Sequence, residues 1–284
     1  GDFGYGRFLL DAQGIKTALT PSFEPRIGAA GTLLQAQLVE ALWESVRDAE
    51  LAPAEFLVYA VAQLPRTRDD IALSGLLARI EAAFRRYLND AQRDKLAPAL
   101  EHALREDGAT GSRRLLLRRT FIDVAWSDAA LAELKRWLGD QALASRDKFR
   151  VVQRLYVRGD PEAPARLAAQ SAADPGDDGR RYAYAALAAD PAAKMKLFRA
   201  FLDDKTLAES WIEAALAPLN APEQSATTRP VLAEALAQLP ELKRRRRIFF
   251  VGNWLSAFVG GQSGPAALAE IKSFLQRDDL DADL

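Results

Sequence analysis

Apolar residues recur at helical spacing along nearly the whole chain after residue 20, and this periodicity decides the fold class. One stripe follows an i, i+3, i+4, i+7 pattern through Leu73, Leu76, Leu77, Ile80, Phe84, Tyr87 and Leu88. Such spacing places apolar side chains on one face of an α-helix. Similar stripes run through residues 34–46 and 207–219. No second run alternates with the period of a strand after residue 11, so the sequence predicts an all-α protein.

Start and stop signals divide these stripes into many short helices. Asp160-Pro161 and Asp190-Pro191 each place a capping carboxylate before a proline at the first helical position. Thr206 with a glutamate three residues later fits a capping box. We find no exact repeat at a fixed period of about 30–45 residues. We therefore expect an irregular HEAT- or armadillo-like stack of antiparallel helix pairs.

The chain divides into two expected parts. Residues 1–11 alternate glycines with larger side chains, which suits a short N-terminal strand stub, and residues 20–284 form one α-helical superhelical domain. The chain begins with glycine and ends in an acidic stretch that resembles a helix start. We interpret the chain as a piece of a longer protein, in which the helical domain is either complete or truncated at its C-terminal end. Residues 174–180 are either an ordinary turn or a boundary between two sub-bundles.

No catalytic or metal-binding pattern occurs in the sequence. The chain has no cysteine and one histidine, His102, whereas a HExxH zinc site needs two histidines and a glutamate. A G-x-S-x-G nucleophile elbow is also missing. We predict no catalytic residue, no metal ligand and no cofactor site in this chain, with His102 at a structural or surface position on a helix.

The charge balance disfavours binding to nucleic acid or to a membrane. The 38 lysines and arginines against 39 aspartates and glutamates give a net charge of −1. The largest basic run, residues 243–247, spreads around all sides of a helix, so we interpret it as a solvated turn. No apolar run approaches the roughly 18 residues of a membrane span. We expect a soluble protein with no nucleic-acid or membrane partner, and the compartment stays open between cytoplasm and periplasm.

Two clusters are candidate substrate-binding sites. Arg180 and Tyr184 lie one helical turn apart, with Arg181 adjacent, and a guanidinium beside a phenol can hold a carboxylate or a peptide carbonyl. The alternative is an ion pair between Arg180 and one of the aspartates just before it. Arg146 and Lys148 form the second cluster, which is either a charged first turn of a helix or a ligand contact.

The opening segment resembles the strand that ends the β-sandwich domain of M1-family zinc aminopeptidases. The family pattern is approximately Gly-Tyr-Tyr-Arg-Val-x-Tyr-Asp, and four positions of the chain match it: Gly4, Tyr5, Arg7 and Asp11. Residues 6, 8 and 10 depart from the pattern. In that family this strand leads directly into a HEAT-like helical domain. Residues 247–258 loosely resemble a late helix of the same domain.

This resemblance implies a non-catalytic C-terminal domain that caps the active-site chamber and shapes peptide access. The zinc and its ligands then belong to an upstream catalytic domain of the parent enzyme. The implied partners are the upstream catalytic and β-sandwich domains of the same polypeptide, together with peptide substrates. The alternative is a free-standing helical-repeat scaffold that binds a protein partner.

Overall fold

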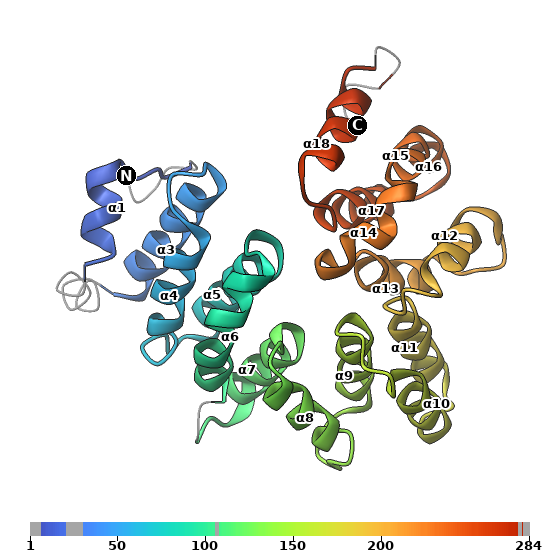
Figure 1. The fold of residues 1–284 in the computed structure, drawn as a ribbon, viewed down its shortest axis with the longest axis horizontal. Coiled ribbons are helices and arrows are strands. Elements are labelled where there is room, and N and C mark those ends of the chain that lie inside the picture. Colours follow the sequence, from blue (N-terminus) through green and yellow to red (C-terminus); the bar gives the residue numbers. More distant parts are fainter. Residues whose placement is uncertain (1–6, 21–30, 106–107, 278–279, 281–284) are drawn as a thin grey trace. The chain divides into compact units, whose positions relative to one another are not determined.

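The computed structural model describes residues 7–20, 31–105, 108–277 and 280. Within these residues every regular element is a helix (Figure 1), so the prediction of an all-α fold is confirmed. Contacts between Cα atoms divide the chain into two compact units, residues 1–130 and 131–284. No helix in the described part of the chain is both long enough and apolar enough to cross a membrane.

The described residues of the first unit lie mostly in helices. Its helices are α1 (Ala12–Ala18), α3 (Thr32–Arg47), α4 (Pro53–Gln63), α5 (Asp70–Ala82), the π-helix η1 (Ala83–Tyr87), α6 (Asp90–Leu104) and α7 (Gly111–Val124). Helix α8 (Asp128–Trp137) begins in the first unit and ends in the second.

Aromatic side chains fix the core of the first unit. The ring of Trp43 on α3 lies 5.3 Å from the rings of both Phe56 on α4 and Tyr87 on η1. The predicted stripe of residues 73–88 is buried except at Tyr87, which is exposed. The start of α6 also follows from its sequence, because Asn89 and Gln92 form a reciprocal capping box.

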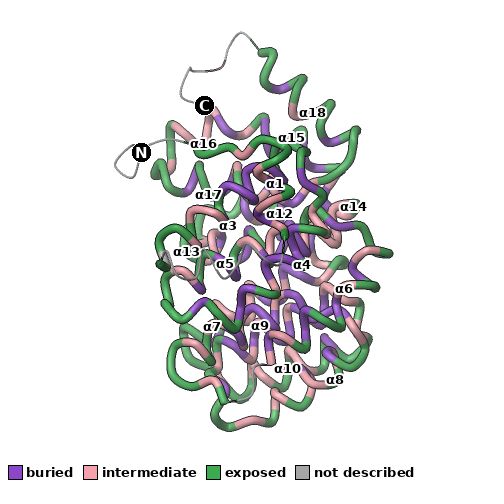
Figure 2. Tube along the Cα trace, turned by 90° about the vertical axis from the view of Figure 1, so that its left-hand side faces the viewer, coloured by how far each residue is buried: buried purple, intermediate pink, exposed green. Residues whose placement is uncertain are grey.

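The second unit contains the remaining helices. They are α9 (Ser145–Val157), α10 (Ala163–Ala173), α11 (Asp177–Leu187), α12 (Lys194–Asp203), α13 (Glu209–Leu219), α14 (Ser225–Thr228), α15 (Leu232–Ala237), α16 (Leu239–Arg245), α17 (Ile248–Gly260) and α18 (Pro265–Leu275), with the 3-10 turns η2 (Pro222–Gln224) and η3 (Arg229–Val231). Figure 2 shows buried and exposed residues alternating along the helices, as expected for helices with one apolar face.

Helices α12, α13 and α15 to α18 share one apolar core. Trp254 and Phe258 on α17 pack against Phe198 on α12, with ring centroids 5.6–6.2 Å apart. The indole nitrogen of Trp254 donates a hydrogen bond to the carbonyl oxygen of Ala235, 2.9 Å away, which satisfies its buried polar atom. This core holds the C-terminal half of the second unit together.

Two local expectations differ from the structure. Residues 7–10 have no regular structure, so the predicted strand is not seen there; residues 1–6 lie outside the described residues. An isolated strand has no neighbour to pair its backbone groups, and Arg7 instead forms an ion pair with Asp48, the residue that follows α3, at 2.7 Å. The capping box at Thr206 is wrong: its hydroxyl donates to Asp204, and α13 begins at Glu209 with no side-chain cap.

The two Asp-Pro signals mark turns that come just before helices. Asp160 accepts a hydrogen bond from the backbone of Glu162, and α10 begins at Ala163. Asp190 does the same for Ala192, and α12 begins at Lys194. The predicted caps are therefore wrong in position: α10 begins two residues after Pro161 and α12 three residues after Pro191. Residues 174–176 form the short connection between α10 and α11.

Candidate functional site

Helix α11 packs against both α9 and α13 (Figure 1). Residues of these three helices line a groove with a volume of about 500 Å³. We call it the arginine groove. It is lined by Arg146, Phe149, Arg150, Gln153, Arg181, Tyr182, Ala185, Ala214 and Pro218. The α9 residues lie at positions i, i+3, i+4 and i+7, so helical spacing alone brings them to one face. The small side chains from α11 and α13 leave the space between the helices open.

The lining of the arginine groove is cationic. It contains three guanidinium groups, one amide and one phenol, and none of its described lining residues is a carboxylate. Arg181 pairs with Asp178 at 2.9 Å, and Arg150 lies 3.8 Å from Asp147. Arg146 is exposed and has no ion pair or hydrogen bond to any described side chain. The cluster therefore keeps one uncompensated positive charge beside the groove, which favours an anionic ligand.

Two of the candidates predicted from the sequence, Arg146 and Arg181, line this groove together from different helices. Sequence reasoning did not find Arg150, Gln153 and Tyr182. The signal that would have found the first two is their spacing from Arg146, at i+4 and i+7. No comparable signal predicts which face of α11 meets α9, because that contact joins residues far apart in the sequence.

Arg180 lies outside the groove lining. Its guanidinium forms an ion pair with Asp177 and donates a hydrogen bond to the carbonyl oxygen of Pro175 at 2.9 Å. This is the ion pair that the sequence offered as the alternative to ligand binding. Lys148 also lies outside the lining, on α9, where no described residue pairs with it.

Tyr184 is partly buried and packs against the core of the second unit. Its ring packs against Phe201 on α12 and Trp211 on α13, with centroids 6.4 and 5.5 Å away. Its hydroxyl is buried with no hydrogen-bond partner among the described residues. Burial, and to a smaller extent the charge of Asp204, raises the pKa of Tyr184 to about 12. The phenol is therefore not paired with Arg180 to hold a ligand.

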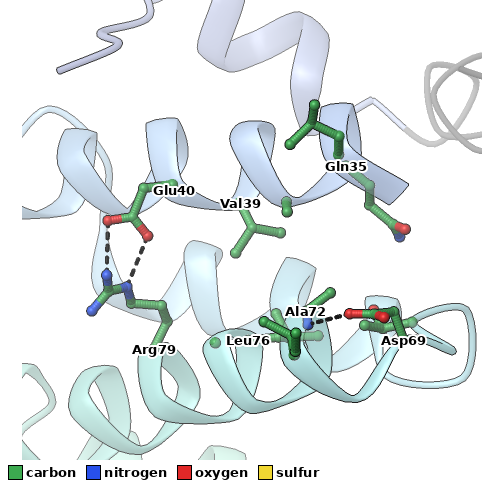
Figure 3. A pocket seen from close by; sticks show the side chains of 12 residues that line it. Gln35, Val39, Glu40, Asp69, Ala72, Leu76 and Arg79 are labelled. Carbon is green, nitrogen blue, oxygen red and sulfur yellow. Dashed lines mark hydrogen bonds and ion pairs between the residues drawn. The ribbon is translucent and has the colours of Figure 1, made fainter. Parts of the chain in front are cut away.

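A second groove, of about 470 Å³, lies between α3 and α5 in the first unit (Figure 3). Val39 and Leu76 form part of its apolar wall. At one end Glu40 and Arg79 form a two-pronged ion pair with distances of 2.8 and 3.0 Å. At the other end Asp69 caps α5. Glu40 and Arg79 pair with each other, and Asp69 accepts a hydrogen bond from the backbone of Ala72, so this site offers mainly apolar contact.

The residues do not fit a catalytic zinc centre. Within the described ranges, no three histidine, cysteine, aspartate or glutamate side chains lie close enough to hold a metal ion. His102 is exposed on α6, in agreement with the surface position expected for it. The charge of the arginine groove favours an anion, whereas its lining supplies neither a metal ligand set nor an activated nucleophile.

Comparison with known proteins agrees with the all-α architecture and with the resemblance in the opening segment. The family model described as ERAP1-like C-terminal domain matches residues 1–283, which is nearly the whole chain. No curated protein matches the chain. The chain therefore belongs to the ERAP1-like C-terminal domain family, the C-terminal domain of M1-family aminopeptidases.

Proposed function

We propose that this chain is the domain that caps the active-site chamber of a zinc aminopeptidase, and that its arginine groove holds the C-terminal carboxylate of the peptide substrate. The catalytic zinc and its ligands then reside in a separate domain of the same polypeptide. Family membership supports the general role. The observation that carries the specific role is the uncompensated guanidinium of Arg146 at a groove that Arg150 and Arg181 also line.

A carboxylate suits this groove for geometric reasons. The planar fork of a guanidinium can donate two parallel hydrogen bonds to the two oxygens of a carboxylate. Arg146 is available for such a pair, and Gln153 and Tyr182 supply further polar groups in the lining. A well-formed contact of this kind contributes about 1.5–3 kcal/mol, less when solvated. The groove is open, so we expect a value toward the lower end.

The proposal predicts a dependence on substrate length. A single aminoacyl-anilide or a dipeptide is too short to reach from a zinc site in another domain to the arginine groove. A longer peptide can place its C-terminus there while its N-terminus reacts. The groove would then contribute binding energy to long substrates alone, which changes kcat/KM according to peptide length.

The test is Arg146→Ala in the intact aminopeptidase that carries this domain. We expect kcat/KM for a peptide of about ten residues to fall by about tenfold, the equivalent of 1.4 kcal/mol, with little change for an anilide. The matched control is Arg180→Ala, which removes an exposed arginine of the same unit that lies outside the groove.

A chemical control sharpens the result. The same peptide with a C-terminal amide in place of the carboxylate should already be a poorer substrate, and Arg146→Ala should not weaken it further. Equal losses for the anilide, the acid and the amide would contradict carboxylate capture, as would equal losses from the two arginine variants.

A further inference from the structure

We propose that the tip between α16 and α17 is a docking surface for an acidic face of another domain in the same polypeptide. We call it the basic–apolar tip, and it consists of Arg244, Arg245, Arg247, Ile248 and Phe249. The inference rests on the proposed function, because that function requires a further domain in the same polypeptide. It concerns a different surface from the arginine groove.

The apolar side chains of the tip are exposed and are not part of the core. Ile248 and Phe249 are the first two residues of α17, with 65% and 80% of their surfaces exposed. The next two residues, Phe250 and Val251, are buried in the core of the second unit. The first turn of α17 therefore leaves one Ile side chain and one Phe side chain, at consecutive positions, exposed to solvent. Such a pair is a common anchor in protein interfaces, where aromatic side chains fill apolar pockets.

The basic part of the tip carries more positive charge than its ion pairs neutralise. Arg244 and Arg245 both pair with the one carboxylate of Glu241. Arg246 and Arg247 both pair with Glu209 of α13, at 3.2 and 3.3 Å. Each carboxylate thus serves two guanidinium groups, which leaves a surplus of one positive charge per pair. Since three of these arginine side chains are well exposed, the surplus favours a partner with acidic groups.

The ion pairs also favour a protein surface over a phosphate-rich partner. Arg246 and Arg247 are directed toward α13, whereas Arg244 and Arg245 are held within α16. The guanidinium groups are therefore divided between two carboxylates and are not aligned in one row along a nucleic-acid backbone. A membrane surface would require a larger apolar face than two side chains for stable binding. An apolar recess with an acidic rim fits both parts of the tip.

Radical footprinting of the intact polypeptide tests the proposal. Hydroxyl radicals modify exposed phenylalanines, and mass spectrometry reports the rate for Phe249. We expect Phe249 in the wild type to be modified at least fivefold more slowly than in the Arg244→Glu/Arg245→Glu variant, in which docking is repelled. Arg180→Glu, a charge reversal outside the tip, is the matched control and should leave Phe249 protected.

Further arms separate the possible occupants. Protection that persists on dilution indicates a domain of the same chain and supports the proposal, whereas protection lost on dilution indicates a second copy and overturns it. Protection that arises only after adding vesicles of phosphatidylcholine with 20% phosphatidylserine also overturns it, as does an unprotected Phe249 throughout. Anilide hydrolysis by the same samples tests the proposed function separately. An active enzyme in which Phe249 is unprotected would contradict only the docking surface. An inactive enzyme in which Phe249 is protected would contradict only the assignment as an aminopeptidase.

Discussion

The ammonium group of Lys194 donates a hydrogen bond to the carbonyl oxygen of Leu219 over 2.6 Å, although the lysine is completely buried. Leu219 is the last residue of α13, so the cation lies at the negative end of the helix dipole. Burial lowers the pKa of Lys194 to about 8, and the charges of Glu223 and Asp190 offset part of that effect. The first residue of α12 thus ties this helix to the end of α13 through a group whose pKa is about 8.

Stability should therefore rise with pH between about 8 and 10. Below pH 8 both the folded and the unfolded chain hold the proton, and the buried cation costs stability. Above pH 8 the folded chain releases it, whereas the unfolded chain keeps it until its ordinary pKa near 10.4. The unfolded state then binds more protons, so the free energy of unfolding increases, by at most about 3 kcal/mol.

Urea unfolding at pH 7.5, 8.5 and 9.5 measures this effect, with Lys194→Met as the reference. Methionine has a similar length and no charge. The difference in free energy of unfolding between the two proteins should therefore change with pH, because the contributions of all other titratable groups are the same in both. Parallel pH profiles for the wild type and Lys194→Met would contradict a titration of Lys194 in this range.

The ion pair between Arg154 and Glu223 should contribute strongly to stability. Its atoms lie 2.6 Å apart, and the two side chains are only 3% and 4% exposed. Glu223→Gln leaves a buried guanidinium without this carboxylate, which we expect to cost about 3–5 kcal/mol in urea unfolding. The control is Glu162→Gln at the exposed pair with Arg166, where we expect a cost below about 1 kcal/mol. Similar losses of unfolding free energy in the two variants would show that burial does not determine how much an ion pair contributes to stability.

Two glycines, one inside α17 and one at its C-cap, should respond in opposite directions to alanine. A Cβ atom at Gly261 would lie 2.2 Å from the carbonyl oxygen of Asn220, so Gly261→Ala forces a backbone shift and should cost about 2 kcal/mol or more. A Cβ atom at Gly252 meets nothing within 4 Å, and Gly252→Ala should stabilise the helix by about 0.5–1 kcal/mol. Thermal unfolding of both variants measures this contrast. Shifts in Tm of the same sign in the two variants would contradict the close approach of Asn220 to Gly261.

Removal of the Tyr184 hydroxyl should not destabilise the protein. This group is buried without a hydrogen-bond partner among the described residues, so Tyr184→Phe removes an unsatisfied polar atom and keeps the ring contacts. We expect a free energy of unfolding equal to that of the wild type or up to about 1 kcal/mol higher. A loss above about 1 kcal/mol would mean that the hydroxyl has a partner in solution.

The sequence predicted the helical class because its apolar stripes are local features. The exception within the stripe of residues 73–88 has a physical cause. Residues 83–87 form a π-helix, whose wider turn changes the phase of the chain, so Tyr87 is exposed while Leu88 is buried. Nothing in the residue types marks that wider turn, and a constant helical period cannot predict it.

The candidate site was harder to predict, because it depends on contacts between helices. Arg180 and Tyr184 are one turn apart, as predicted, but α11 places the tyrosine between α12 and α13 while Asp177 holds the arginine. The arginine groove joins residues 146 and 218, which no local pattern connects. Arg146 and Arg181 were found as individual residues, and only the packing of three helices shows that they share a site.

The uncompensated charge of Arg146 has a practical consequence for the choice of buffer. A guanidinium beside an open groove attracts small anions, and phosphate or citrate carries the same kind of oxygen atoms as a peptide terminus. Such ions would compete directly with long substrates, so an assay in phosphate and one in a zwitterionic buffer of equal ionic strength should give different KM values for the same peptide. Anilide turnover should be the same in both, and peptide specificity measured in phosphate would underestimate the preference for long chains.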